Sequence, residues 1–158
     1  MRLADASTVA DYRTARTLFE AYARSLAVDL SYQRFDEELM KIETLYGPPR
    51  GALLLALEDG RPLGCIAVRE LDDDVCEMKR LYVVPAARGR GLGRLLAEAA
   101  IRRATALGYH LMRLDTLTSM TSAAGLYRSL GFREIAPYYE TPHPTLFFEL
   151  PLDEGDDR

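Results

Sequence analysis

The chain has 158 residues, of which 48% are hydrophobic and 28% are charged, as expected of a single globular domain with a sizeable core. Its formal net charge of −4 disfavours a general nucleic-acid surface, and no apolar run is long enough to span a membrane. With no apolar leader at its start, the sequence predicts a cytoplasmic protein with one domain over residues 1–152 and an acidic tail over residues 153–158.

The first third of the chain is predicted to form a short strand and two helices. The strand covers residues 1–5, and Thr8 and Asp11 have the spacing of a capping box at the start of the first helix. A second helix is predicted from Phe35 to Tyr46, and the run Gly47-Pro48-Pro49 ends it. The buried face of the first helix is marked by apolar residues at helical spacing, which are Val9, Tyr12, Ala15, Phe19, Tyr22 and Leu26.

From Gly51 onward the pattern changes to that of β-strands. Strands are predicted over residues 52–58, 62–71 and 75–84. The dipeptide Asp59-Gly60 is a hairpin signal, and an acidic run from Asp72 to Asp74 suits the next turn. Because the links are short, the three strands are expected to form an antiparallel meander.

The two cysteines, Cys65 and Cys76, fall in neighbouring predicted strands. Burial as reduced thiols is the favoured interpretation, and a disulfide or a reactive thiol is the alternative. Since the sequence has no second cysteine pair and no Cys/His cluster, we expect no zinc or other metal site.

The second half of the chain alternates helices with strands. A helix is predicted over residues 91–107, with Gly108 as its C-terminal cap, and a strand over residues 110–117. That strand should run parallel to the preceding one, because a helix crosses between them. Ser119 or Thr121 is expected to cap a helix that ends near Leu130.

Two further strands, over residues 132–138 and 145–150, are joined by a proline-containing loop. The predicted fold is therefore mixed α/β, in the order β-α-α-β-β-β-α-β-α-β-β, with a central mixed sheet and helices on both of its faces.

The stretch from Val83 to Leu96 is the most distinctive in the sequence. Pro85 ends a β-branched run, and the glycines that follow alternate with arginines before the helix begins. Glycines at such a junction leave backbone N–H groups exposed, and the helix dipole adds positive potential, so an anion site is predicted. The stretch lacks the G-x-G-x-x-G pattern of dinucleotide sites and the Lys-Ser/Thr of a P-loop, so the anion has to be identified from other residues.

Two motifs resemble the GNAT superfamily of N-acetyltransferases. The family pattern Leu-x-Val-x-Pro-x-x-Arg/Gln-x-x-Gly-x-Gly/Ala is matched by Leu81, Val83, Pro85, Arg88, Gly91 and Gly93. The second pattern, Ala-x-x-Leu-Tyr-x-x-Leu-Gly-Phe, is matched by Ala123, Leu126, Tyr127, Leu130, Gly131 and Phe132. The resemblance covers almost the whole chain and implies the GNAT fold, in which the sheet splays between the fourth and fifth strands.

The resemblance implies acetyl-CoA as cosubstrate. Backbone N–H groups from Arg88 to Arg94 would hold its pyrophosphate, and the backbone from Leu81 to Val83 would pair with its pantetheine arm. For the arginine side chains the alternative is a solvated surface. The family's usual Asn before the second motif is Met120 here, which puts one polar contact in doubt; Thr118 or Ser119 is the candidate substitute. The implied cofactor-binding residues are Leu81, Tyr82, Val83, Arg88, Gly89, Arg90, Gly91, Leu92, Gly93 and Arg94.

Acetyl transfer from a thioester needs a neutral amine, a polarised carbonyl and a protonated leaving thiolate. Tyr127 matches the family tyrosine that acts as the acid, although a tyrosine in the core is the alternative. A backbone N–H near Val83 is implied to polarise the carbonyl. The hypothesis for the base is Glu77, directly or through a water, because it is a charged residue in an apolar run. Its alternative is a cross-strand salt bridge with Arg69 or Arg113, and His143 is the rival base.

In the family, the acceptor cleft lies between the first two helices and the loop joining the last two strands. This placement makes Tyr32, Phe35, Tyr138 and His143 candidate substrate-binding residues. We expect a small-molecule amine as acceptor. A protein or peptide acceptor and a non-catalytic acyl-CoA-binding domain are the alternatives, and the resemblance also suggests a homodimer.

Overall fold

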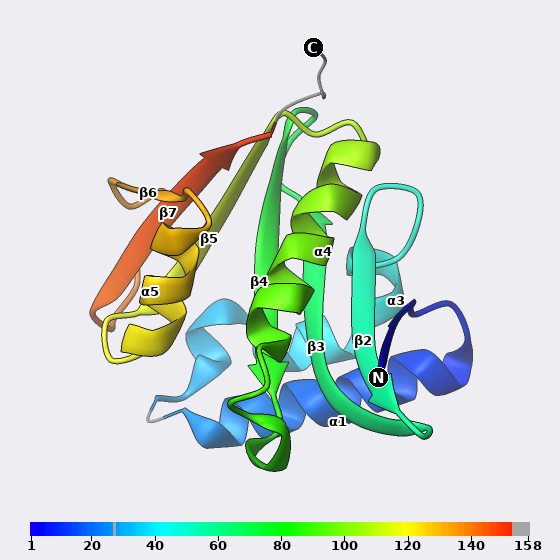
Figure 1. Ribbon diagram of the computed structural model, residues 1–158. Helices are drawn as coiled ribbons and strands as arrows, with labels where there is room; N and C mark the ends of the chain where they lie inside the picture. Colours follow the sequence, from blue (N-terminus) through cyan, green and yellow to red (C-terminus); the bar gives the residue numbers. More distant parts are fainter. Residues whose placement is uncertain (27, 153–158) are drawn as a thin grey trace.

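The computed structural model describes residues 1–26 and 28–152, so the acidic tail predicted over residues 153–158 lies outside the described part (Figure 1). In that part the chain forms a mixed seven-stranded sheet in the order β1-β2-β3-β4-β5-β7-β6. The strands are β1 (Arg2–Asp5), β2 (Ala52–Glu58), β3 (Arg61–Glu70), β4 (Val75–Val83), β5 (Leu111–Leu117), β6 (Arg133–Ile135) and β7 (Thr145–Pro151). The helices are α1 (Val9–Ser25), η1 (Leu30–Gln33), α2 (Phe35–Met40), α3 (Ile42–Leu45), η2 (Pro85–Ala87), α4 (Leu92–Ala106) and α5 (Thr121–Ser129).

The predicted mixed α/β order is confirmed, and several local signals act as expected. The backbone N–H of Asp11 donates to the Thr8 hydroxyl over 3.0 Å, which confirms the capping box of α1. Asp59 and Gly60 both have positive φ, 52° and 77°, so the hairpin between β2 and β3 is confirmed. Cys65 and Cys76 are buried free thiols, as predicted.

Other local predictions are wrong. Val9 is 67% exposed, because α1 begins there and turns this side chain outward. Met120 is the N-cap residue of α5 and no side chain caps this helix end, so neither Ser119 nor Thr121 has the predicted role. The strand predicted over residues 132–138 ends at Ile135, because Pro137 has no N–H for the ladder. The second predicted helix, over residues 35–46, is divided at Lys41 into α2 and α3; η1 precedes it, and Arg34, with a φ of 58°, separates η1 from α2.

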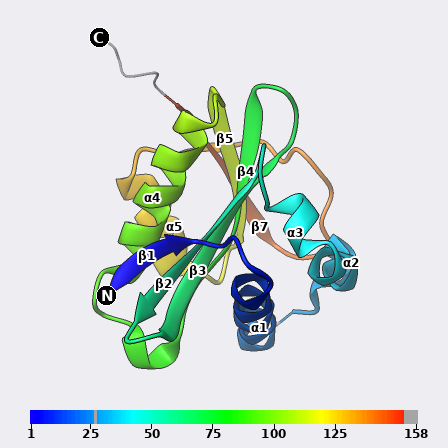
Figure 2. The same cartoon turned by 90° about the vertical axis from the view of Figure 1, so that its right-hand side faces the viewer.

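Helices cover both faces of the sheet: α4 and α5 lie on one face and α1, α2 and α3 on the other (Figure 2). Successive residues of β2 therefore point into two cores. Leu54 packs with the α4 face and Leu55 with the α1 face, and both are nearly inaccessible to solvent. This is why the sequence of β2 is apolar throughout. Of the helices in the described residues, none is long and apolar enough to cross a membrane.

The sheet opens between β4 and β5, as the resemblance implied. Parallel pairing extends only from Val75 opposite Leu111 to Glu77 opposite Arg113, and beyond it the two strands diverge (Figure 1). Arg80 forms a β-bulge: the pairing on β3 advances two residues while β4 advances three, and the φ of Arg80 is 62°. The bulge shifts the alternation along β4, so that Leu81 and Val83 face the same side as Met78.

Candidate active site

A groove of about 580 Å³ lies where β4 and β5 diverge. Leu81 and Val83 of β4 form one wall, and residues at the start of α5 form the other. Arg88 and Gly93 lie at the α4 end of the groove. Met120, which replaces the family's usual Asn, lines it together with Ser119, whereas Thr118 is not among the lining residues.

The residues of the predicted anion site lie at the first turn of α4. Gly91 is the N-cap residue, with a φ of 77°, and Gly89 has a φ of 81°, so both occupy the left-handed region that glycine adopts without strain. The space beside each is open where a Cβ would stand. Arg88 is held near this turn because its Nε donates to the carbonyl of Val83 over 3.0 Å. The exposed N–H groups and this guanidinium fit a phosphate ligand.

The side chains of three other predicted cofactor-binding residues are engaged elsewhere. Arg90 forms an ion pair with Glu58 over 2.9 Å, at the β2–β3 hairpin. Arg94 lies 3.8 Å from Glu98 and donates to the hydroxyl of Ser129. Leu92 is a core residue, 3% exposed. The Arg90 and Arg94 side chains are nearly half exposed, so these two ion pairs are surface pairs.

Tyr82, also predicted on the cofactor side, points its ring to the opposite face of the sheet. The ring packs edge-on against Tyr22, with centroids 6.2 Å apart, and the guanidinium of Arg88 lies 5.9 Å from its centre. Its backbone continues the β4 wall of the groove between Leu81 and Val83. Only the backbone of Tyr82 is therefore placed for the pairing that the resemblance implied.

Tyr127 lies on α5 directly after Leu126, which lines the groove. Its side chain is 6% exposed and packs edge-on against Phe132, with ring centroids 5.8 Å apart. It also lines a small cavity of about 30 Å³ between β4 and β5, together with Lys79 and Asp115. Burial raises the pKa of the phenol, so Tyr127 keeps its proton at neutral pH.

Glu77 is the last β4 residue paired with β5, and it is only 2% exposed. Its carboxylate accepts hydrogen bonds from Arg69 Nε at 2.9 Å and from the Tyr138 hydroxyl at 2.7 Å. Lys79 Nζ lies 3.9 Å from the same carboxylate. Burial alone would raise the pKa of Glu77, but the charges of Lys79 and Arg69 and the two hydrogen bonds more than offset it, so the pKa lies below its ordinary value.

Asp115 on β5 is a second carboxylate, which the sequence analysis did not single out. It accepts a hydrogen bond from the Tyr139 hydroxyl over 2.6 Å. Burial raises its pKa, and the Lys79 charge and the Tyr139 hydrogen bond offset this only in part. Its sequence signal is the one that marked Glu77, a charged residue within an apolar strand.

On the other side of the splay, a cleft of about 360 Å³ lies between η1, β3, β4 and the β6–β7 loop. Tyr138 lines it, as predicted for a substrate-binding residue, and so does Tyr139. Phe35 lies instead in the core, with the Arg80 guanidinium 5.3 Å from its ring centre. His143 is half-buried in the β6–β7 loop and is not among the residues lining the cleft. Tyr32 lies in η1, and its side chain is outside the described part of the structure.

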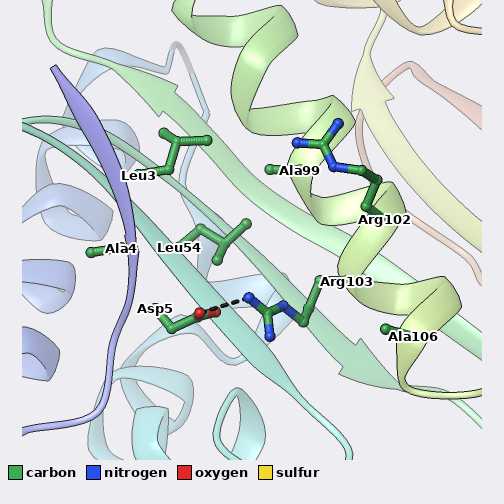
Figure 3. Close-up of a pocket in the computed structure, with 8 residues that line it drawn as sticks. All are labelled: Leu3, Ala4, Asp5, Leu54, Ala99, Arg102, Arg103 and Ala106. Carbon is green, nitrogen blue, oxygen red and sulfur yellow. Dashed lines mark hydrogen bonds and ion pairs between the residues drawn. The ribbon is translucent and has the colours of Figure 1, made fainter.

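Another pocket lies away from the splay, between β1 and α4 (Figure 3). Its side chains are mostly aliphatic, and Asp5 and Arg103 form an ion pair across it over 2.6 Å. None of the predicted site residues lines it. Over residues 1–26 and 28–152, no three His, Cys, Asp or Glu side chains are grouped to hold a metal ion.

A model of the acetyltransferase (GNAT) family matches residues 13–132. An uncharacterised N-acetyltransferase of Schizosaccharomyces pombe is 42% identical over 135 residues, which cover 84% of this chain and 83% of the relative. N-acetylaspartate synthetase of Homo sapiens is 31% identical over 113 residues, covering 69% of this chain and 37% of that protein.

The fold is also found among solved structures. A putative acetyltransferase of Salmonella typhimurium, solved with acetyl-CoA, superimposes with a TM-score of 0.72 at 22% identity. The match covers 100% of this chain and 97% of that one.

Proposed function

The chain belongs to the GNAT family of acetyltransferases, and on this premise we propose that it transfers the acetyl group of acetyl-CoA to a primary amine of a small molecule. The observation that carries the proposal is the groove at the splay, which begins at the α4 N-terminus and shares Leu81, Met120 and Ala123 with the small cavity that Tyr127 lines. A structural neighbour is solved with acetyl-CoA, which supports this donor. The human relative is named for an acetylated small molecule, N-acetylaspartate, which supports this class of acceptor.

The donor fits the groove by two kinds of contact. Its pyrophosphate would accept hydrogen bonds from the first-turn N–H groups of α4, with Arg88 adding charge. Its pantetheine amides would pair with the backbone of Leu81–Val83, which lies beyond the last residue pair of β4 with β5. The hydroxyls of Ser119 and Thr121 line the groove near Met120, where the family's Asn contact is missing.

The reaction forms an N–C bond between the amine and the acetyl carbon and breaks the C–S bond of the thioester. Tyr127 donates a proton to the departing thiolate and is reprotonated from solvent. The amine loses a proton, and we propose Asp115 as its acceptor, because this carboxylate lines the same cavity as Tyr127 and burial raises its pKa. Glu77, directly or through a water, is the second candidate, but its hydrogen bonds and nearby cations make it a weaker base.

The shape of the acceptor side favours a small molecule over a protein segment. Tyr138 donates to Glu77 and Tyr139 to Asp115, so the β6–β7 loop is tied to both strands at the splay. The rings of both tyrosines pack edge-on against Phe147, with centroids 5.1 Å apart in each case. A loop held at four points in this way bounds the cleft on one side and leaves less room for a polypeptide.

Replacing Tyr127 by Phe tests the acid role. We expect kcat for acetyl transfer, measured as thiol release from acetyl-CoA with a panel of amines, to fall by about 100-fold or more. The Kd for acetyl-CoA should stay within about twofold, because the ring and its packing are kept.

Tyr109→Phe is the matched control. It also removes a buried hydroxyl, whose partner is the carbonyl of Arg50 at 2.6 Å, but it lies outside both clefts. Its turnover should resemble that of the wild type. Unchanged turnover in Tyr127→Phe would exclude the acid role, and acetyl-CoA binding without transfer to any amine would contradict the proposed activity.

A further inference from the structure

Basic side chains gather on the acceptor side of the splay. The cleft beside Tyr138 and Tyr139 adjoins a second one, of about 330 Å³, and the two share Gln33, Arg34, Arg69 and Lys79 in their linings. Three of these four shared residues carry a positive charge. The sequence marked Arg69 as a possible partner of Glu77, but only the tertiary structure brings Arg34, Arg69 and Lys79 together in one lining.

The acidic residues in the same linings are already engaged. Glu38 accepts hydrogen bonds from Arg80, which approaches from the core, and from Tyr46. Glu77 is held by Arg69 and Tyr138. Glu37 faces Arg34 at 3.7 Å, but both side chains are more than half exposed, so this pair is weak. Lys79 is a largely buried cation whose ion pair, with Glu77, is shared with Arg69, while Asp115 and Glu38 act on it through longer-range charge.

Lys79 is the centre of this arrangement. Its side chain is 14% exposed, and it lines both acceptor-side clefts as well as the cavity that holds Tyr127 and Asp115. Its ammonium group lies 3.9 Å from the Glu77 carboxylate, which is 1 Å closer to Arg69, at 2.9 Å. A largely buried ammonium group facing an open cleft is stabilised when an anion enters the cleft.

We propose that the acceptor is an amine that also carries a carboxylate, as an amino acid does, and that Lys79 and Arg69 bind this carboxylate, with Arg34 at the mouth of the cleft. The inference rests on the proposed function. Because Lys79 also lines the cavity with Tyr127 and Asp115, a carboxylate on the ammonium group places an amine one or two carbons away beside the splay. There the amine nitrogen bonds to the acetyl carbon, its proton passes to Asp115, and the thiolate takes the Tyr127 proton. The products are an N-acetyl carboxylate and free CoA.

The test compares amines in pairs that differ by the carboxylate: alanine with ethylamine, glutamate with 4-aminobutyrate, and aspartate with β-alanine. Thiol release from acetyl-CoA is measured with the full chain. We expect alanine to exceed ethylamine in kcat/KM by about 30-fold or more, the loss expected when a buried charge has no partner. The two longer pairs report whether a second carboxylate adds to this preference.

Variants locate the binding group. Lys79→Met should raise KM for the preferred carboxylate by about 30-fold more than it raises KM for ethylamine, whereas any change in kcat should be shared by the two amines, because Lys79 also lies beside Asp115 and Tyr127. Lys79→Arg should recover most of the loss, because it keeps the charge. Arg102→Met is the matched control, since it removes a cation from the pocket between β1 and α4. Unchanged acetyl-CoA affinity in Lys79→Met shows that the variant is folded.

The outcomes separate the two proposals. Turnover of ethylamine equal to or better than that of alanine would overturn the carboxylate site and leave the acetyltransferase in place. An equal loss in Lys79→Met for amines with and without a carboxylate would also overturn it. Acetyl-CoA binding with no turnover of any amine would overturn the proposed function itself.

Discussion

Glu77 and Asp115 show how surroundings set the chemistry of a side chain. Glu77 is buried and Asp115 half-buried at the splay, and each accepts a hydrogen bond from a tyrosine of the same loop. Glu77 also has Arg69 at 2.9 Å, and its pKa is lowered, whereas burial dominates at Asp115 and raises its pKa. A base that works near neutral pH benefits from the raised pKa. Glu77 therefore suits the role of holding Arg69, Lys79 and Tyr138 in place.

The pH dependence of kcat distinguishes the two carboxylates. If Asp115 accepts the amine proton, kcat falls as the pH drops through its raised pKa, because the protonated carboxyl cannot take a proton. Asp115→Asn should lower kcat by about 100-fold and abolish this low-pH limb. Glu77→Gln should keep the limb and mainly raise KM. If instead the fall of kcat at low pH disappears in Glu77→Gln and persists in Asp115→Asn, the base is Glu77.

At the scale of elements, the donor site depends on the backbone at the start of α4. Gly91 caps a helix of 15 residues from a left-handed conformation, and η2 brings Arg88 beside it. Strand β4 contributes to the groove through the bulge at Arg80, because the bulge turns Leu81 and Val83 toward it. The turn at Gly91 and the bulge at Arg80 are features of the backbone. Substitutions at these residues are therefore expected to change acetyl-CoA binding by altering the backbone conformation.

Gly91→Ala tests this dependence. A Cβ meets no atom within 4 Å, so the expected cost, about 1–2 kcal/mol in the free energy of unfolding, comes from the φ of 77° alone. Acetyl-CoA affinity should also fall, by about tenfold, because the strained turn relaxes away from the geometry of the N–H groups.

Gly60→Ala is the matched control for Gly91→Ala. Gly60 has the same φ, 77°, and equally open surroundings, but it lies in the hairpin between β2 and β3. Urea unfolding should show a similar loss of stability in both variants, and calorimetric titration should show weaker acetyl-CoA binding in Gly91→Ala alone. Equal affinities in the two variants would contradict the role of the α4 N-terminus.

At the scale of the whole molecule, a buried ion pair ties the acceptor-side helices to the sheet. Glu38 of α2 accepts hydrogen bonds from Arg80 of β4, with Nε at 2.9 Å, and from Tyr46 at 2.9 Å. The two charged side chains are 6% and 3% exposed. Removing one partner would leave the other charge buried without compensation. The Glu38–Arg80 pair thus links the bulge in β4 to helix α2, and Glu38 also lines the cleft of about 330 Å³.

Glu38→Gln should lower the free energy of unfolding by about 3–5 kcal/mol near pH 7, measured by urea denaturation. Burial alone would raise the pKa of Glu38, but the hydrogen bond and charge of Arg80 hold it below its ordinary value of 4.5. The pair therefore stabilises the wild type above that value, and the contribution is lost as the pH falls through the folded-state pKa.

The difference in stability between wild type and Glu38→Gln should consequently shrink as the pH is lowered below about 4. Glu37→Gln is the control: this side chain is 58% exposed, and its removal should cost less than about 0.5 kcal/mol. A constant difference between wild type and Glu38→Gln across this pH range would contradict the assignment.

The sequence by itself determined the order of strands and helices, the glycine turn before α4 and the two GNAT motifs, because these depend on local spacing and on residues with special backbone preferences. Glycines at left-handed positions and apolar residues at periods of two or 3.6 act within a few residues of the chain. The end of β6 is local as well, because Pro137 marks it in the sequence, whereas the uncapped start of α5 depends on the path of the chain around Met120.

Only the tertiary structure decided the partners of the buried charges. Glu77, Lys79 and Arg69 are brought together by pairing between β3 and β4, and Asp115 by the splay, so their pKa shifts arise from contacts between distant segments. The bulge at Arg80 decided which face each later β4 residue presents, because one extra residue reverses the alternation. The residues of the proposed donor site are therefore marked mostly by local sequence signals, whereas those of the proposed acceptor site are brought together by tertiary contacts.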